Sequence, residues 1–205
     1  MTGAAKWLRW FEIALAVVGI SILGGVFAAT VLRWNFQARQ ERAFVQREKA
    51  LARQEHALVA SPLIAAPAVI DQRPADPLEF ARIEIPRVGV NAIVREGVDD
   101  ATLALAVGHI EWTALPGETG NIALAGHRDT FFRGLRNIRL DDRICLYVPP
   151  HSYEYRVVSL EVVAPKETRV LDPTGGQELT LVTCHPFAFV GRAPNRFIVR
   201  ATRVE

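Results

Sequence analysis

Runs in which every second residue is apolar fill the C-terminal part of the chain. Alternation with a period of two residues is typical of β-strands that bury one face. Glycine, proline and aspartate residues separate these runs, as they do between the short strands of barrels and sandwiches. The pattern predicts a mainly β domain over residues 78–205. The clearest runs cover residues 81–85, 143–148, 153–163, 179–184 and 196–201.

Two short helices are expected inside this β domain. One is predicted over residues 99–106 and the other over residues 130–138. Each segment begins at side chains that accept hydrogen bonds from the first free N–H groups of a helix. The expected caps are Asp99 or Asp100 for the first helix and Asp129 or Thr130 for the second.

The N-terminus has a different pattern, because the twenty residues 13–32 carry no charge. As a helix this stretch would be about 30 Å long, which matches the hydrocarbon thickness of a bilayer. Trp7, Trp10 and Trp34 lie at its two ends, and tryptophan favours the interface between lipid and water. We expect a retained single-pass transmembrane helix within residues 1–35.

Two other interpretations of the apolar stretch are weaker. A cleavable signal peptide would use Lys6 and Arg9 as its basic region, but the stretch is longer than a typical signal core. A buried soluble helix would show a polar face, and this stretch has none. Basic residues lie on both sides of the span, so the positive-inside rule does not by itself place the C-terminal domain outside the membrane.

Residues 36–77 are expected to connect the membrane helix to the β domain. The first part is charged and helical, with a seven-residue repeat that places Phe44, Leu51 and Leu58 at one position. A coiled coil needs a second apolar position in each heptad, and here it falls on charged or polar residues. A solvated stalk helix is therefore favoured over a dimer zipper. The four prolines within 61–77 predict an extended linker.

Composition and charge narrow the class of partner. The 205 residues are 50% hydrophobic and 22% charged, with a formal net charge of +2. Positive and negative residues are mixed along the chain, so no electrostatic case for nucleic-acid binding exists. The length suits one core of ordinary size plus an appendage.

The strongest candidate for chemistry is Cys184, which stands at the end of a predicted strand. Thiolates are nucleophiles, and a nearby imidazole commonly makes or uses one. The next predicted strand begins at Arg196. If the two strands form an antiparallel hairpin, Cys184 and Arg196 face each other, and the guanidinium could stabilise an oxyanion. The alternative is a surface arginine on an edge strand.

His127 is the candidate imidazole, because it follows another predicted strand at 120–125. The alternative is a plain loop histidine at a strand end. Asp129 could orient the ring, but its position favours a helix cap.

Cys145 is the other cysteine of the chain and lies within a predicted strand. We expect it to be free and packed. A disulfide with Cys184 would be an alternative outside the cytoplasm, but it would silence the nucleophile. A zinc site that combines both cysteines with His151 and His185 is disfavoured, because adjacent Cys and His residues cannot easily bind one tetrahedral ion.

These motifs resemble the sortase family over residues 78–205. Residues 180–184 read TLVTC and match the TLxTC signature of sortases. Residues 120–128 are similar to the strand that leads to the catalytic histidine, and 193–199 to the strand that carries the arginine. The GHRDTFF and APNRFIV segments resemble class D sortases in particular.

The resemblance implies a closed eight-stranded sortase-type β-barrel and a cysteine transpeptidase at the cell membrane. Cys184 would attack the bond between Thr and Gly or Ala in an LPxTG-like sorting signal. His127 would protonate the leaving amine and then activate the incoming one, while Arg196 would hold the signal and stabilise the oxyanion. Thr183 would contact the substrate. The catalytic domain would be extracytoplasmic.

The partners implied by the resemblance are a protein with a C-terminal LPxTG-like signal and an amine of peptidoglycan or of a pilin. No cofactor is expected. Some sortases use calcium, and Glu111, Glu118 and Glu167 are candidate ligands without a diagnostic spacing. Two functional alternatives remain open: a peptidase that ends the same chemistry with water, and a membrane-tethered barrel that binds a partner without catalysis.

Residues 115–120 read LPGETG and imitate a sorting signal with one residue too many. They lie inside the domain, ahead of a strand, with no apolar or basic tail after them. We expect a tight turn there.

Overall fold

The computed structural model describes residues 3–59 and 81–204. It divides into two compact units, residues 1–39 and residues 40–205. The proline-rich linker predicted at 61–77 lies outside the described residues. The domain boundaries expected at residues 35, 77 and 78 stay predictions.

The N-terminal unit belongs to one continuous helix, α1 (Gly3–Val59). By length and composition it is a candidate membrane span within Arg9–Gln46. Its apolar side chains are exposed, as Leu23 and Phe27 illustrate. The hydroxyls of Ser21 and Thr30 each donate to the carbonyl four residues earlier at 2.8 Å, so these two polar groups are satisfied without water.

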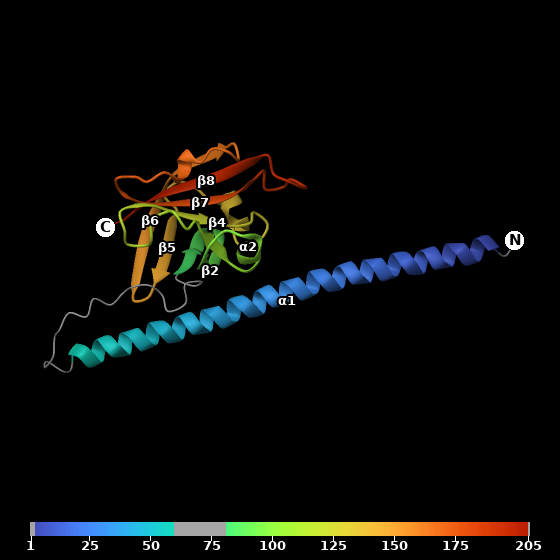
Figure 1. Cartoon of the computed structure of the whole chain (residues 1–205), viewed down its shortest axis with the longest axis horizontal. Helices are drawn as coiled ribbons and strands as arrows, with labels where there is room; N and C mark the ends of the chain where they lie inside the picture. Colours follow the sequence, from blue (N-terminus) through green and yellow to red (C-terminus); the bar gives the residue numbers. More distant parts are fainter. Residues whose placement is uncertain (1–2, 60–80, 205) are drawn as a thin grey trace. The chain divides into compact units, whose positions relative to one another are not determined.

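The second unit contains a closed eight-stranded barrel, which confirms the fold that the family resemblance implied (Figure 1). Each strand pairs with two neighbours in the order β1-β2-β3-β4-β7-β8-β6-β5 and back to β1. Closure leaves no open edge at which another chain could pair. The strands are β1 (Ala81–Ile85), β2 (Val90–Glu96), β3 (Val107–His109), β4 (Gly120–Ala125), β5 (Arg143–Val148), β6 (His151–Val163), β7 (Gln177–His185) and β8 (Asn195–Arg203).

Two strand pairs are parallel, β2 with β3 and β4 with β7, and the others are antiparallel. The β4–β7 pair determines where the site forms. Ala125 lies opposite Val182, and parallel strands end at the same edge of a sheet. The residues that follow β4 and those at the end of β7 therefore meet at one rim of the barrel.

The core fills the barrel with alternate residues of the strands. In β1, Ala81, Ile83 and Ile85 are buried and the residues between them are only half-buried, which is the predicted alternation. Cys145 of β5 is also buried and forms no disulfide. It lies in the ladder between Glu84 and Glu154.

The first predicted helix is confirmed and the second is not. The α2 helix (Asp100–Leu105) is capped by Asp99, whose side chain accepts from the N–H groups of Ala101 and Thr102. In place of a helix over 130–138 the chain makes turns and then a 3₁₀ helix, η2 (Arg133–Asn137), without a side-chain cap. Two further 3₁₀ turns are η1 (Pro86–Val88) and η3 (Arg169–Leu171).

Close packing explains the irregular path of this segment. A Cβ atom on Gly134 would lie 2.3 Å from the Val88 carbonyl oxygen, so only glycine fits there. Phe132 and Leu135 are both fully buried. Both belong to the hydrophobic core, and the glycine between them is a poor helix former.

Candidate active site

Cys184 and Arg196 lie directly opposite each other in the antiparallel β7–β8 ladder. Residues paired in this way have Cβ atoms about 5 Å apart. Both side chains are half-buried at the rim of the barrel. The Arg196 guanidinium donates to the Asn195 carbonyl at 3.1 Å and forms no ion pair within the described part of the chain. No carboxylate of the described residues therefore neutralises its charge.

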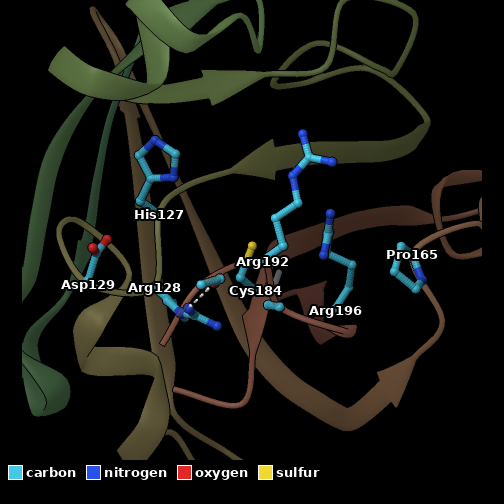
Figure 2. Close-up of a pocket in the computed structure, with 9 residues that line it drawn as sticks. His127, Arg128, Asp129, Pro165, Cys184, Arg192 and Arg196 are labelled. Atoms are coloured by element: carbon cyan, nitrogen blue, oxygen red, sulfur yellow. Dashed lines mark hydrogen bonds between the residues drawn. The ribbon is translucent and has the colours of Figure 1, made fainter. Parts of the chain in front are cut away.

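His127 reaches the same rim from β4. It follows the strand by two residues, and the parallel β4–β7 pair brings it beside the end of β7. Figure 2 shows His127 and Arg196 on the two sides of Cys184. The three line one pocket of about 620 Å³, a size that suits a peptide segment. The other lining residues are Arg128, Asp129, Pro165, Gly191, Arg192 and Ala193.

Thr183 ties the end of β7 to the residue that follows β4. Its side chain is buried, and its hydroxyl donates to the Gly126 carbonyl at 2.7 Å. The Gly126 N–H in turn donates to the Val182 carbonyl at 3.1 Å. Thr183 does not line the pocket, so the structure assigns it a positioning contact that sequence reasoning missed. Its contact with substrate stays a prediction.

Arg128 holds the β7–β8 loop in place. Its guanidinium donates to the carbonyls of Pro186 at 2.8 Å, Phe189 at 2.6 Å and Gly191 at 3.0 Å. The same group lies 6.0 Å from the centre of the Phe189 ring. We call this set of contacts the Arg128 clamp; Figure 2 shows Arg128 itself at the pocket. The carbonyl groups of an irregular loop lack the hydrogen-bond partners that a strand or helix would provide. Here the guanidinium of Arg128, the residue after His127, donates to three of them.

Aromatic rings support the end of β7. The ring of His185 lies 6.1 Å from that of Phe187 and 6.2 Å from that of Phe197, and the two phenylalanines are 5.5 Å apart. Both phenylalanines pack against the core. Side chains alternate along a strand, so this cluster lies on the face opposite Cys184 and stiffens the strand that presents it.

Comparisons with known proteins identify the family. The model of the sortase domain matches residues 83–204, which is more than half of the chain. The chain belongs to the sortase family. It is 35% identical to "Sortase D" of Bacillus subtilis over 123 residues, 60% of this chain and 62% of that protein. It is 30% identical to "Sortase A" of Bacillus anthracis over 109 residues, 51% of each.

Solved sortase structures share the barrel. A Clostridium perfringens Sortase D5 transpeptidase is 31% identical with a TM-score of 0.56, over 62% of this chain and 79% of that one. Sortase A from Corynebacterium diphtheriae is 28% identical with a TM-score of 0.60, over 78% and 83%. The resemblance to class D is consistent with these matches. The chain spans about half to three fifths of the two curated relatives named above.

In this sortase barrel a buried polar pair secures the segment between β6 and β7. Asn121 donates to the Val170 carbonyl at 3.1 Å and accepts from the Thr180 hydroxyl at 2.7 Å. The pair fixes η3 against β4 and β7. Pro165 of the same segment lines the pocket, so this network helps to hold the pocket wall opposite the clamped loop.

Two of the candidate calcium ligands, Glu118 and Glu167, already have hydrogen-bond partners within the protein. Glu118 accepts from the Leu115 N–H at 2.9 Å, within a tight turn over 115–118, as expected for this segment. Glu167 pairs with Arg169 at 2.8 Å, and that hydrogen bond lowers the pKa of Glu167. Among the residues that the structure describes, no group of three His, Cys, Asp or Glu could hold a metal ion.

Proposed function

We propose that the protein is a membrane-anchored cysteine transpeptidase that cleaves an LPxTG-like sorting signal after its threonine. It joins the new carboxyl end to an amine of the cell wall or of another protein. The observation that carries this proposal is the convergence of Cys184, His127 and Arg196 on one pocket. Membership of the sortase family supports it.

The first half-reaction forms a thioester. The Cys184 thiolate attacks the threonine carbonyl carbon, and the carbonyl oxygen becomes an oxyanion beside the Arg196 guanidinium. The intermediate collapses when the C–N bond to glycine or alanine breaks. The His127 imidazolium gives its proton to the leaving amine, so the ring ends the step neutral.

The second half-reaction reverses these roles. Neutral His127 takes a proton from the incoming amine as its nitrogen attacks the thioester carbonyl. Arg196 again stabilises the oxyanion. The C–S bond breaks, the new amide forms, and Cys184 leaves as a thiolate beside a protonated His127, which restores the starting state.

The anchor and its orientation are part of the proposal. The α1 helix is long and apolar enough to cross a bilayer, and sorting signals and their amine acceptors meet outside the cytoplasm. We place the barrel on that side. Protease accessibility of the barrel in intact cells tests the orientation: cleavage without lysis agrees with it, and protection until lysis contradicts it.

Product analysis tests the reaction. The full chain in detergent micelles is incubated with a labelled LPxTG-type peptide, with and without a small amine, and the products are identified by mass. We expect an amide product with the amine and none from C184A. A peptide acid as the sole product at saturating amine would make the protein a hydrolase. Unchanged peptide would favour a non-catalytic module.

A further inference from the structure

The pocket around Cys184 carries an excess of positive charge. Three arginines line it, Arg128, Arg192 and Arg196, against a single carboxylate, Asp129. In the part of the chain that the structure describes, Asp129 forms no ion pair with any of them. The cationic groups are thus not neutralised from within the protein. A field of one sign in a concave site attracts ligands of the opposite sign.

The three guanidiniums have different tasks. Arg128 is committed to the carbonyls of the β7–β8 loop. Arg196 lies opposite Cys184 and faces the reacting carbonyl in the proposed mechanism. Arg192 has neither task. It is exposed at the pocket rim, and among the described contacts its side chain has no hydrogen bond or ion pair.

The Arg128 clamp fixes the backbone on which Arg192 stands. Arg128 donates at 3.0 Å to the carbonyl of Gly191, which belongs to the peptide unit that joins Gly191 to Arg192. Gly191 has a φ of 92°, a conformation that favours glycine. The backbone at Arg192 is therefore held by the folded loop before any ligand arrives, and Arg192 lines the same pocket as Cys184 (Figure 2).

We propose that Arg192 is a specificity residue that binds a carboxylate carried by the substrate close to the scissile bond. The inference rests on the proposed function and names the chemistry of its substrate. The planar fork of a guanidinium matches a carboxylate. The carboxylate would belong either to the variable residue of the sorting signal or to the amine acceptor, beside its nucleophilic nitrogen. Because Arg192 is exposed, the preference is modest and sensitive to salt.

A charge-swap experiment on the full chain in detergent separates the two sources. In the first arm, single-turnover acylation is measured without acceptor for Leu-Pro-Xaa-Thr-Gly peptides with Xaa as Glu, Gln or Lys. In the second arm, the Gln peptide is fixed, and glycine or diglycine is compared with the corresponding amide as acceptor. A faster reaction with the anionic peptide in the first arm means that Arg192 binds a carboxylate of the sorting signal. A faster reaction with the anionic acceptor in the second arm means that it binds a carboxylate of the acceptor.

We expect a preference of about three- to tenfold for the anionic member in one arm, since exposed ion pairs contribute little individually. R192Q should abolish it, R192E should reverse it, and R192K should keep part of it. About 0.5 M salt should reduce the wild-type ratio towards one. R136E is the matched control, because it changes the net charge equally at an exposed residue outside this pocket; it should keep the wild-type ratio.

The outcomes separate this inference from the proposed function. Equal rates for all charge variants in both arms, with normal turnover, would overturn the role of Arg192 and leave the transpeptidase intact. A wild-type preference that R192E leaves unchanged would do the same. Failure to acylate with any peptide would overturn the proposed function and this inference with it. Circular dichroism confirms that each variant is folded before the ratios are compared.

Discussion

The hydroxyl of Thr183 donates to the carbonyl of Gly126 at 2.7 Å, one residue before Cys184 on one strand and one residue before His127 on the other. The bond lies in the buried end of the parallel β4–β7 pair. The backbone segments that carry the Cys184 sulfur and the His127 imidazole are thus joined directly by a buried hydrogen bond. The buried strand ends therefore fix the backbone directly before both residues.

Replacing Thr183 tests whether this hydrogen bond positions the two residues. T183V keeps the shape but removes the donor, which leaves a buried carbonyl with one partner fewer and costs about 1–3 kcal/mol of unfolding free energy. We expect kcat/KM for acylation to fall at least about tenfold, because misplacement of reacting groups is expensive. T183S retains the hydroxyl and should stay within about threefold of the wild type. Equal acylation by T183V and the wild type would contradict the positioning role.

Arg196 should act through geometry as well as charge. R196A removes the group that faces the oxyanion, and we expect kcat/KM to drop about 10²- to 10³-fold, as on loss of an oxyanion donor. R196K keeps the charge but loses the planar fork, so it should recover only part of that loss. Steady-state kinetics with the labelled peptide measure both. Full activity of R196K would show that charge alone suffices.

Arg128 should affect selectivity more than the chemical step. R128K can reach fewer of the three loop carbonyls, so the backbone at Arg192 becomes mobile while the strands that carry Cys184 and His127 are unchanged. We expect the ratio of the acylation rate with an anionic peptide to that with a cationic peptide to fall towards one. The acylation rate with the neutral Gln peptide should decrease by a smaller factor than this rate ratio does. A large loss of the acylation rate with an unchanged rate ratio would show that Arg128 acts on the chemical step and not on selectivity.

The ion pair between Arg87 and Asp142 predicts a pH dependence of stability. Arg87 binds both carboxylate oxygens of Asp142, and the Arg139 N–H donates to the same carboxylate at 2.7 Å. These hydrogen bonds, that of Arg87 first, lower the pKa of Asp142. Its stabilisation is therefore present above the ordinary aspartate pKa of about 3.9 and is lost as the pH falls through the lower pKa of the folded state.

D142N should therefore destabilise the barrel at pH 7 and progressively less below about pH 4. At neutral pH we expect a loss of about 1–3 kcal/mol, because a hydrogen bond to a charged group is removed. Thermal unfolding followed by circular dichroism at several pH values measures the difference. D141N is the matched control on the neighbouring residue, whose side chain is exposed. A difference that grows on acidification would have the wrong sign.

Local patterns predicted most of the strands and the pairing of Cys184 with Arg196, but they did not single out β2 or the short β3. The alternation in β1 and β7 shows which face is buried, and the hairpin follows from the order of β7 and β8. The parallel β4–β7 contact joins strands that are more than fifty residues apart. No local signal specifies such a pair, so the strand-end position made His127 a candidate, and only the family resemblance implied that it lies beside Cys184.

The contacts made by loops and 3₁₀ turns could not be predicted. The Arg128 clamp joins residues 58 to 63 positions apart, and which loop carbonyls can accept from Arg128 depends on the final path of the loop. The helix expected over 130–138 was wrong: the chain forms turns and then the 3₁₀ helix η2, in which Gly134 packs closely against the Val88 carbonyl. Tertiary packing overrode local propensity at that segment.

Intact-mass spectrometry of the full chain, quenched shortly after addition of a sorting-signal peptide, tests the central claim most directly. We predict an adduct equal to the acyl part of the peptide ending in threonine, mapped to Cys184 and released as an amide when an amine is added. No adduct, or an adduct that persists in C184A or maps to Cys145, would contradict the proposed thioacyl chemistry.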